Sequence, residues 1–209
     1  MKRNSIVLSI VLAVLALLGW AGWANFEFRK QAAERSMATM AHGVLVPDAQ
    51  TGAALYVSPL VGKPAPAFTL DDLNGKKVSL ADYKGTALLI NFWATWCAPC
   101  RIETPWIVEL RNKYAREGFE VLGISADDLD PTDKQRFNEA KHTIQHTAIQ
   151  LQIPYPVLLN ADSISTPYGG LDSLPTSFFV DRKGIVTAAQ MGLTSKQDIE
   201  RNIRKALGK

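Results

Sequence analysis

The sequence has little of what defines several classes of protein. It contains only two cysteines, at positions 97 and 100, which excludes a disulfide-rich scaffold. Its formal net charge is only +3 at pH 7, so charge gives no reason to expect a nucleic-acid partner. Glycine and proline follow no period, and no internal repeat of about 20–50 residues occurs, which excludes collagen-like and solenoid architectures.

What is present is the composition of a globular protein. Hydrophobic residues make up 47% of the 209 residues and charged residues 21%. This length accommodates one ordinary domain with additional segments. We divide the chain into an amino-terminal segment (1–26), a stalk or linker (27–61) and a folded domain (62–209).

The amino-terminal segment is long enough to cross a membrane. No charged residue occurs from Asn4 to Phe26, a run of 23 residues, and about 20 apolar residues span a bilayer as a helix. Because Lys2 and Arg3 precede the run, we expect that end to stay in the cytoplasm and the domain to face outward. The alternative is a signal peptide cleaved after Ala24, which would release a secreted or periplasmic protein. Either way, the domain reaches an oxidising compartment.

Strand-like and helix-like patterns alternate along the folded domain. The apolar runs at 87–94 and 119–125 are typical of strands buried on both faces. Shorter strands are expected at 68–70, 77–80, 156–160, 176–181 and 185–190, and helices at 97–114, 131–151 and 195–207, the last two capped by Asp130 and Ser195. Asn74-Gly75 predicts a hairpin between the first two short strands. This order indicates an α/β fold, a mixed central sheet with helices on both faces.

The two cysteines lie where a buried strand passes into a helix. Cys97 falls at the helix amino end, with Thr95 as a possible cap, and the helix dipole there favours a thiolate. Such positions lower a thiol pKa from about 8.5 into roughly the 3.5–7.5 range. We therefore predict that Cys97 attacks a disulfide and that Cys100 resolves the mixed disulfide. Pro99, in the first turn, would hold the two sulfurs within reach of each other.

Other interpretations of the cysteine pair remain open. Half of a zinc or copper site would need further ligands, and His42, His142 and His146 are the only histidines. A structural disulfide, a thiol peroxidase and a non-catalytic binding module are the remaining alternatives. We favour a redox dithiol and predict no metal and no cofactor.

Two further features have both a functional and an ordinary interpretation. Glu103 follows Cys100 by three residues; if it points inward, burial raises its pKa and lets it exchange a proton with Cys100. A solvated helix carboxylate is the alternative. The Leu174-Pro175 bond precedes a strand and could be cis, although a trans proline is the ordinary expectation.

Residues 91–105 (NFWATWCAPCRIETP) and 169–181 (GGLDSLPTSFFVD) together resemble the thioredoxin superfamily, specifically its exported, often membrane-anchored TlpA/ResA-like thiol:disulfide oxidoreductases. The resemblance extends over about 62–207. It implies a thioredoxin-like fold with an amino-terminal hairpin and an inserted helix–strand unit. It also implies a Cys97–Cys100 redox disulfide, a thiol-tuning role for Glu103, and a cis Pro175 across from that disulfide.

The resemblance also predicts the substrate groove and the function. Backbone groups of Leu174 would pair with a bound substrate chain as an added strand, and Trp96, Pro99 and Pro175 would form or support the groove. The implied activity is reduction of disulfides in exported proteins such as apocytochrome c, with electrons from a membrane thiol donor.

Three departures from the family pattern stand out. Asn91 occupies the place of a buried aspartate in plain thioredoxin, so proton handling would pass to Glu103. Residues 165–170 are short where relatives carry a fuller helix. Residues 42–61 have no counterpart that we can place in the family.

Overall fold

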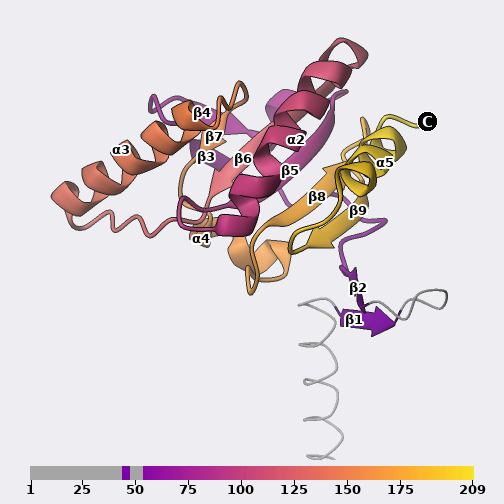
Figure 1. The fold of residues 1–209 in the computed structure, drawn as a ribbon, viewed down its shortest axis with the longest axis horizontal. Helices are drawn as coiled ribbons and strands as arrows, with labels where there is room; N and C mark the ends of the chain where they lie inside the picture. Colours follow the sequence, from indigo (N-terminus) through magenta and orange to yellow (C-terminus); the bar gives the residue numbers. More distant parts are fainter. Residues whose placement is uncertain (1–43, 48–53) are drawn as a thin grey trace, which may run out of the picture. The chain divides into compact units, whose positions relative to one another are not determined.

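A five-stranded sheet in the order β7-β6-β5-β8-β9 forms the centre of the domain (Figure 1). The computed structural model describes residues 44–47 and 54–209, with only the backbone described up to residue 57. The strands are β5 (Ala87–Trp93), β6 (Phe119–Ser125), β7 (Val157–Leu158), β8 (Thr176–Val180) and β9 (Val186–Met191). β5 runs parallel to β6 and antiparallel to β8. The predicted mixed sheet is confirmed.

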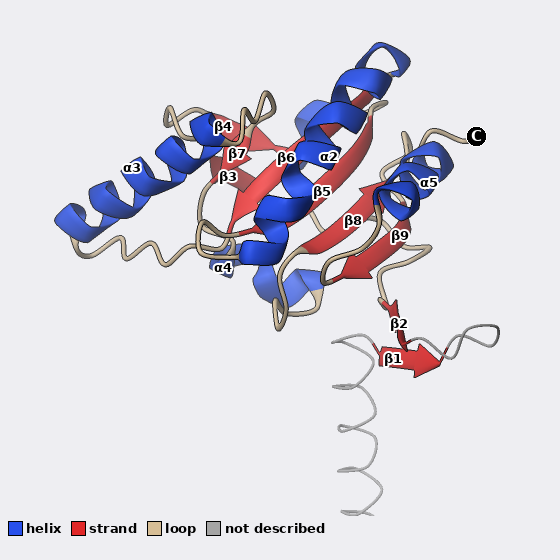
Figure 2. Cartoon of the chain, in the orientation of Figure 1, coloured by secondary structure: helices blue, strands red, loops and turns tan. Residues whose placement is uncertain are grey.

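Three helices pack on one face of this sheet (Figure 2). They are α2 (Ala98–Tyr114), α3 (Lys134–Gln150) and α5 (Lys196–Ala206). Apolar side chains of α2 and α5 meet the inward-facing residues of β5, β6 and β8. Those of α3 meet Trp93 and the two cysteines. Because successive strand residues point to opposite faces, the near-continuous apolar runs of β5 and β6 need cover on the other side too.

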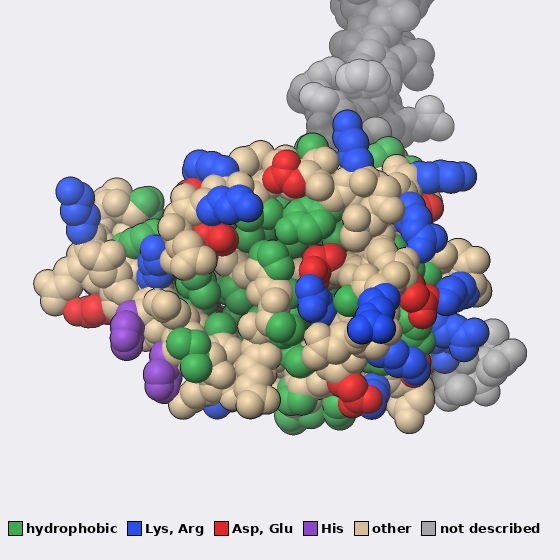
Figure 3. Space-filling model, turned by 90° about the horizontal axis from the view of Figure 1, so that it is seen from above, with side chains coloured by type: hydrophobic (Ala, Val, Ile, Leu, Met, Phe, Trp, Pro, Cys, Tyr) green, Lys and Arg blue, Asp and Glu red, His purple; other side chains and the backbone are tan. Residues whose placement is uncertain are grey.

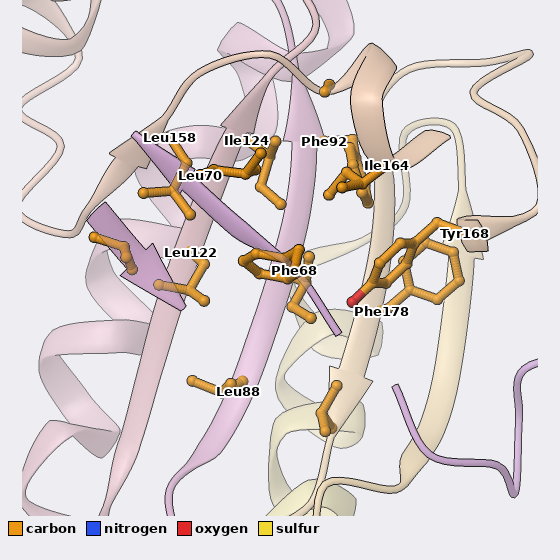
Figure 4. Close-up of a cluster of buried hydrophobic side chains, with 14 of the residues drawn as sticks. Phe68, Leu70, Leu88, Phe92, Leu122, Ile124, Leu158, Ile164, Tyr168 and Phe178 are labelled. Carbon is orange, nitrogen blue, oxygen red and sulfur yellow. The ribbon is translucent and has the colours of Figure 1, made fainter. Parts of the chain in front are cut away.

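The other face is covered by the predicted hairpin and a short helix. The hairpin pairs β3 (Thr69–Asp71) with β4 (Lys77–Ser79), and α4 (Asp162–Ser165) contributes Ile164 to the same apolar cluster. Figure 4 shows side chains from these segments gathered against β5 and β8. Tyr168 is central: its ring centroid lies 5.3 Å from that of Phe92 and 5.1 Å from that of Phe178. Aromatic pairs at such separations add to the burial energy, so one tyrosine anchors a segment that is too short for a full helix.

Three short 3-10 helices complete the described regular structure, at Leu80–Tyr83, Ala115–Glu117 and Thr166–Tyr168. The third lies within the segment that the sequence marked as short and broken.

The start of α3 was predicted wrongly. The cap is Asp133, whose Oδ1 accepts from the backbone N–H groups of Gln135 at 3.0 Å and Arg136 at 3.1 Å. Asp130 is occupied elsewhere, since its carboxylate accepts from both the backbone and the hydroxyl of Thr132. A local turn thus precedes the helix.

The residues that lead into the domain bond to both outer strands of the sheet. Gly62 N–H donates to the carbonyl of Val186 in β9 at 2.8 Å, and Val186 N–H donates to the carbonyl of Lys63 at 2.9 Å. Further along, Leu159 N–H, just after β7, donates to the carbonyl of Asp71 at 2.9 Å. The chain therefore passes from one side of the sheet to the other before β5 begins.

Part of the segment predicted as a linker is regular. Val44–Pro47 (β1) and Ala54–Val57 (β2) pair as an antiparallel two-stranded sheet, which the irregular sequence at 42–61 did not indicate. The expected membrane segment, 1–26, lies outside the described residues. Within the described ranges, no helix combines the length and the apolar character that crossing a bilayer needs.

Candidate active site

The two cysteines are joined by a disulfide bond at the start of α2. Cys97 is itself the helix cap: its Sγ accepts from the backbone N–H of Cys100 at 3.2 Å. Thr95, which the sequence offered as one candidate for the cap, does not serve this purpose. The sulfur of Cys97 thus occupies the position in which a helix amino terminus favours negative charge.

Only one of the two cysteines borders open space. Cys97, 3% exposed, lines a hollow of about 420 Å³, which we call the active-site hollow, whereas Cys100, 1% exposed, lies behind it and is not among the lining residues. The walls are residues 96–99, Ala126 with Asp162, and residues 171–174. An incoming disulfide can therefore reach the sulfur of Cys97 first. The residues that line the hollow come from the end of the sheet where α2 begins and α4 is found, as the ribbon in Figure 1 shows.

A cis proline follows the third wall of this hollow. The Leu174–Pro175 bond is cis, as the family resemblance implies. Pro175 is buried, and its carbonyl accepts from Gly192 N–H at 2.7 Å, which holds the loop against the end of β9. Leu174 packs beside the cluster that contains both cysteines. Within the described part of the chain, the backbone N–H and carbonyl of Leu174 have no hydrogen-bond partner, so an added strand could use them.

Glu103 is buried beneath the disulfide helix. Only 2% of the residue is exposed, and its Oε1 accepts from Asn91 Nδ2 at 3.0 Å. Burial raises the pKa of Glu103 from its ordinary 4.5 to about 7, although the bond from Asn91 acts in the opposite direction. The same Asn91 amide also donates to Ser177 Oγ at 3.0 Å. Of the two interpretations offered by the sequence, the buried carboxyl is the one observed.

Tyr155 completes the surroundings of this carboxyl. Burial raises the pKa of its hydroxyl, and the nearby Glu103 raises it further. The Tyr155 ring also lies over Gly123 of β6, where an added Cβ would meet its Cε2 at 3.1 Å. The strand β5, the helix α2 and the Tyr155 ring thus surround the carboxyl of Glu103.

Sequence reasoning missed Asp127, which holds the loop before Cys97. Its carboxylate accepts from Thr95 N–H at 3.1 and 3.2 Å, from Thr95 Oγ1 at 2.5 Å and from Ser125 Oγ at 2.8 Å. The sheet register explains the contact, because Trp93 of β5 pairs with Ser125 of β6. Thr95 lies two residues after Trp93, and Asp127 lies two residues after Ser125. The carboxyl ends of neighbouring parallel strands lie at the same edge of a sheet. An aspartate just after β6 could therefore have been predicted to lie near the loop that leads to Cys97.

The described histidines do not converge on the cysteines. His142 and His146 are exposed on α3, at the surface seen in Figure 3. Across the residues that the structure describes, no three His, Cys, Asp or Glu side chains gather in a way that could hold a metal ion.

A disulfide at a helix start, bordering a hollow beside a cis proline on a mixed sheet, places this domain in the class of thioredoxin-like thiol–disulfide oxidoreductases. Residues 61–189 match the AhpC/TSA family. The thiol-disulfide oxidoreductase ResA of Bacillus thuringiensis (strain Al Hakam) is 35% identical over 145 residues, which cover 69% of this chain and 78% of the relative. The thioredoxin-like protein YneN of Bacillus subtilis is 32% identical over 142 residues, covering 68% and 78%.

A solved structure supports the same family assignment. A thiol:disulfide interchange protein of the thioredoxin family from Chlorobium tepidum matches with a TM-score of 0.60 and 33% identity, covering 69% of this chain and 96% of that one. The chain belongs to the AhpC/TSA family of thioredoxin-like proteins, and it is a thiol–disulfide oxidoreductase of the ResA type.

Proposed function

We propose that this protein is an extracytoplasmic reductant that opens disulfides in exported proteins such as apocytochrome c. The observation that carries the proposal is the asymmetry of the pair: Cys97 borders the active-site hollow at a helix amino end, and Cys100 lies behind it. We further propose that residues 1–26 anchor the chain in the membrane, or are cleaved near Ala24, and that a membrane thiol donor returns electrons to the disulfide.

In the proposed cycle, the reduced enzyme supplies both electrons. The Cys97 thiolate attacks one sulfur of the substrate disulfide, which forms a mixed disulfide and releases the other substrate sulfur as a thiolate. The Cys100 thiolate then attacks the sulfur of Cys97, which breaks the mixed disulfide and releases the second substrate sulfur as a thiolate. The products are the enzyme disulfide and the substrate dithiol. The enzyme has lost two electrons, and the substrate has gained them.

The resolving step needs a proton acceptor, because a buried thiol is protonated near neutral pH. Glu103 has a pKa of about 7 and lies on the same helix, one turn beyond Cys100. We propose that it takes the proton of Cys100 during resolution and returns it when the disulfide is reduced. Asn91 would orient the carboxyl, and Trp96, Pro99, Leu174 and Pro175 would line or support the bound substrate strand.

The experiment that tests the proposal is substrate trapping in cells. In Cys100→Ser, resolution is blocked, so exported proteins should accumulate as mixed disulfides with Cys97 that disappear on reduction. The matched control, Cys97→Ser, keeps the buried thiol and should trap nothing. Equal trapping by both variants, or by neither, would contradict the assigned roles.

A second measurement tests the direction of electron flow. A reductant requires a low reduction potential, so a value near the roughly −120 mV of a strong protein oxidant would exclude this role. Peroxide consumption that survives Cys100→Ser but not Cys97→Ser would instead identify a thiol peroxidase. Stoichiometric copper binding that is lost in His142→Ala or His146→Ala would identify a metal chaperone.

A further inference from the structure

The active-site hollow carries negative charge on two of its walls. Asp162 opens α4, and Asp172 lies in the loop that leads to the cis proline. Both side chains are exposed. Within the described part of the chain, neither carboxylate makes a hydrogen bond or an ion pair. Both charges are therefore available to a molecule that enters the hollow.

No positive side chain balances these carboxylates within the hollow. The residues that line it include no lysine, arginine or histidine, and Arg101, although it follows Cys100, is not among them. The remaining wall presents Trp96, whose residue surface is 70% exposed. An open indole face attracts cationic groups, and attracts them more strongly when carboxylates lie nearby.

We propose that the active-site hollow selects substrate chains that carry lysine or arginine within a few residues of the attacked disulfide. The inference rests on the proposed disulfide reduction and names its substrate class. A basic side chain next to the reacting cysteine would meet Asp162 or Asp172 while the disulfide approaches Cys97. The attraction is short in range, because exposed charges are screened beyond about 10 Å at 0.1 M salt.

The net charge of the whole protein makes this inference easy to test. The formal net charge of the whole chain is only +3, and its positive sign gives basic peptides no advantage at long range. A preference for basic peptides would therefore have to originate in the local field of the hollow. Global charge and local charge predict opposite orders of reactivity.

The test uses the reduced full-length protein and three peptides with the same disulfide, flanked by lysine, glutamine or glutamate pairs. We expect the second-order rate constant at low salt to fall in that order, by about tenfold from lysine to glutamate. In 0.5 M NaCl the three rates should converge. Replacing both carboxylates, Asp162→Asn with Asp172→Asn, should bring the lysine-to-glutamate ratio close to one.

The matched control removes the same two charges elsewhere. Glu109 on α2 and Glu139 on α3 are exposed and do not line the hollow, so Glu109→Gln with Glu139→Gln should retain the ratio. Equal rates for the three peptides, or a ratio that survives the Asp162/Asp172 replacement, would overturn the inference and leave disulfide reduction intact. Failure to reduce any peptide would overturn the proposed function as well.

Discussion

Asn91 on the central strand donates one hydrogen bond to the buried carboxyl of Glu103, at 3.0 Å. A second bond from the same amide to Ser177, also 3.0 Å, fixes its orientation. An amide can donate to a carboxylate without adding charge of its own. The domain therefore contains one buried acid at this position, and the proton transfer proposed for the resolving step rests on that single group.

Replacing this acid should change how stability depends on pH. The folded-state pKa of Glu103 is raised to about 7 from 4.5, so the folded protein binds more protons than the unfolded chain between these values. Stability from this group is complete below about pH 4.5 and is lost as the pH rises through 7, by up to about 3 kcal/mol. Glu103→Gln should abolish that loss.

Urea denaturation of the disulfide form at pH 5 and pH 8 measures this effect, because disulfide-bonded cysteines do not titrate. The exposed carboxylate Glu109, on the same helix, supplies the control Glu109→Gln. If the difference in unfolding free energy between wild type and Glu103→Gln is the same at both pH values, Glu103 does not titrate as described.

The amide partner of Glu103 should tune its acidity. The hydrogen bond from Asn91 lowers the pKa of Glu103 against the effect of burial. In Asn91→Ala, the pKa should therefore move above its value of about 7, because burial then acts unopposed. Carboxyl carbon NMR over a pH series would follow the titration directly. An unchanged or lower midpoint would show that the bond does not favour the ionised form.

Removing the Asp127 carboxylate should loosen the loop that carries Trp96 and Cys97. Asp127→Ala loses bonds from Thr95 and Ser125. These bonds are only partly buried, so water replaces part of their contribution, and the net loss should be that of about one bond to a charged acceptor, roughly 1.5–3 kcal/mol. We expect a loss of about 2 kcal/mol in unfolding free energy and a slower reaction of Cys97 with a small disulfide.

The neighbouring Asp128 provides the control for that variant. Its side chain is 82% exposed and makes one loose ion pair, 3.7 Å from Arg136. Asp128→Ala should change stability by no more than about 0.5 kcal/mol. Equal effects of the two replacements would indicate that charge near the site matters and that the Asp127 contacts do not.

A side chain at Gly123 should be crowded by two aromatic rings. A Cβ there would lie 3.1 Å from Tyr155 Cε2 and 3.3 Å from Trp93 Nε1. Gly123→Ala should cost about 1–3 kcal/mol through overpacking. Because the tyrosine ring makes the closer contact, the cost should shrink in a Tyr155→Leu background, as a double-mutant cycle by denaturant unfolding would reveal. Equal costs in both backgrounds would locate the strain elsewhere.

Local patterns sufficed where a single segment carries the whole signal. The apolar run at 119–125 became β6 with the predicted bounds, and Ser195 caps α5 as expected, accepting from Asp198 N–H. The start of α3 shows the limit, since Asp130 and Asp133 are equally good caps by residue type. The choice between them depends on the turn that Thr132 closes.

Contacts that cross the sheet could not be predicted from local patterns. The bond from Thr95 to Asp127 joins residues 32 positions apart and depends on the register of β5 and β6. The burial of Glu103 likewise needs α2 to lie over Asn91. Sequence spacing placed the carboxyl near Cys100 but left both orientations open, and only packing against the strand decides between them.

The hydrogen bonds that the lead-in residues make at both outer strands also bear on aggregation. An unpaired strand edge can add a strand from another polypeptide chain. Here Lys63 takes up the Val186 N–H of β9, and Asp71 accepts from Leu159 beside β7, a strand of only two residues. Backbone groups at the start of β9 and just after β7 are therefore already paired within the domain and cannot receive a strand from another chain.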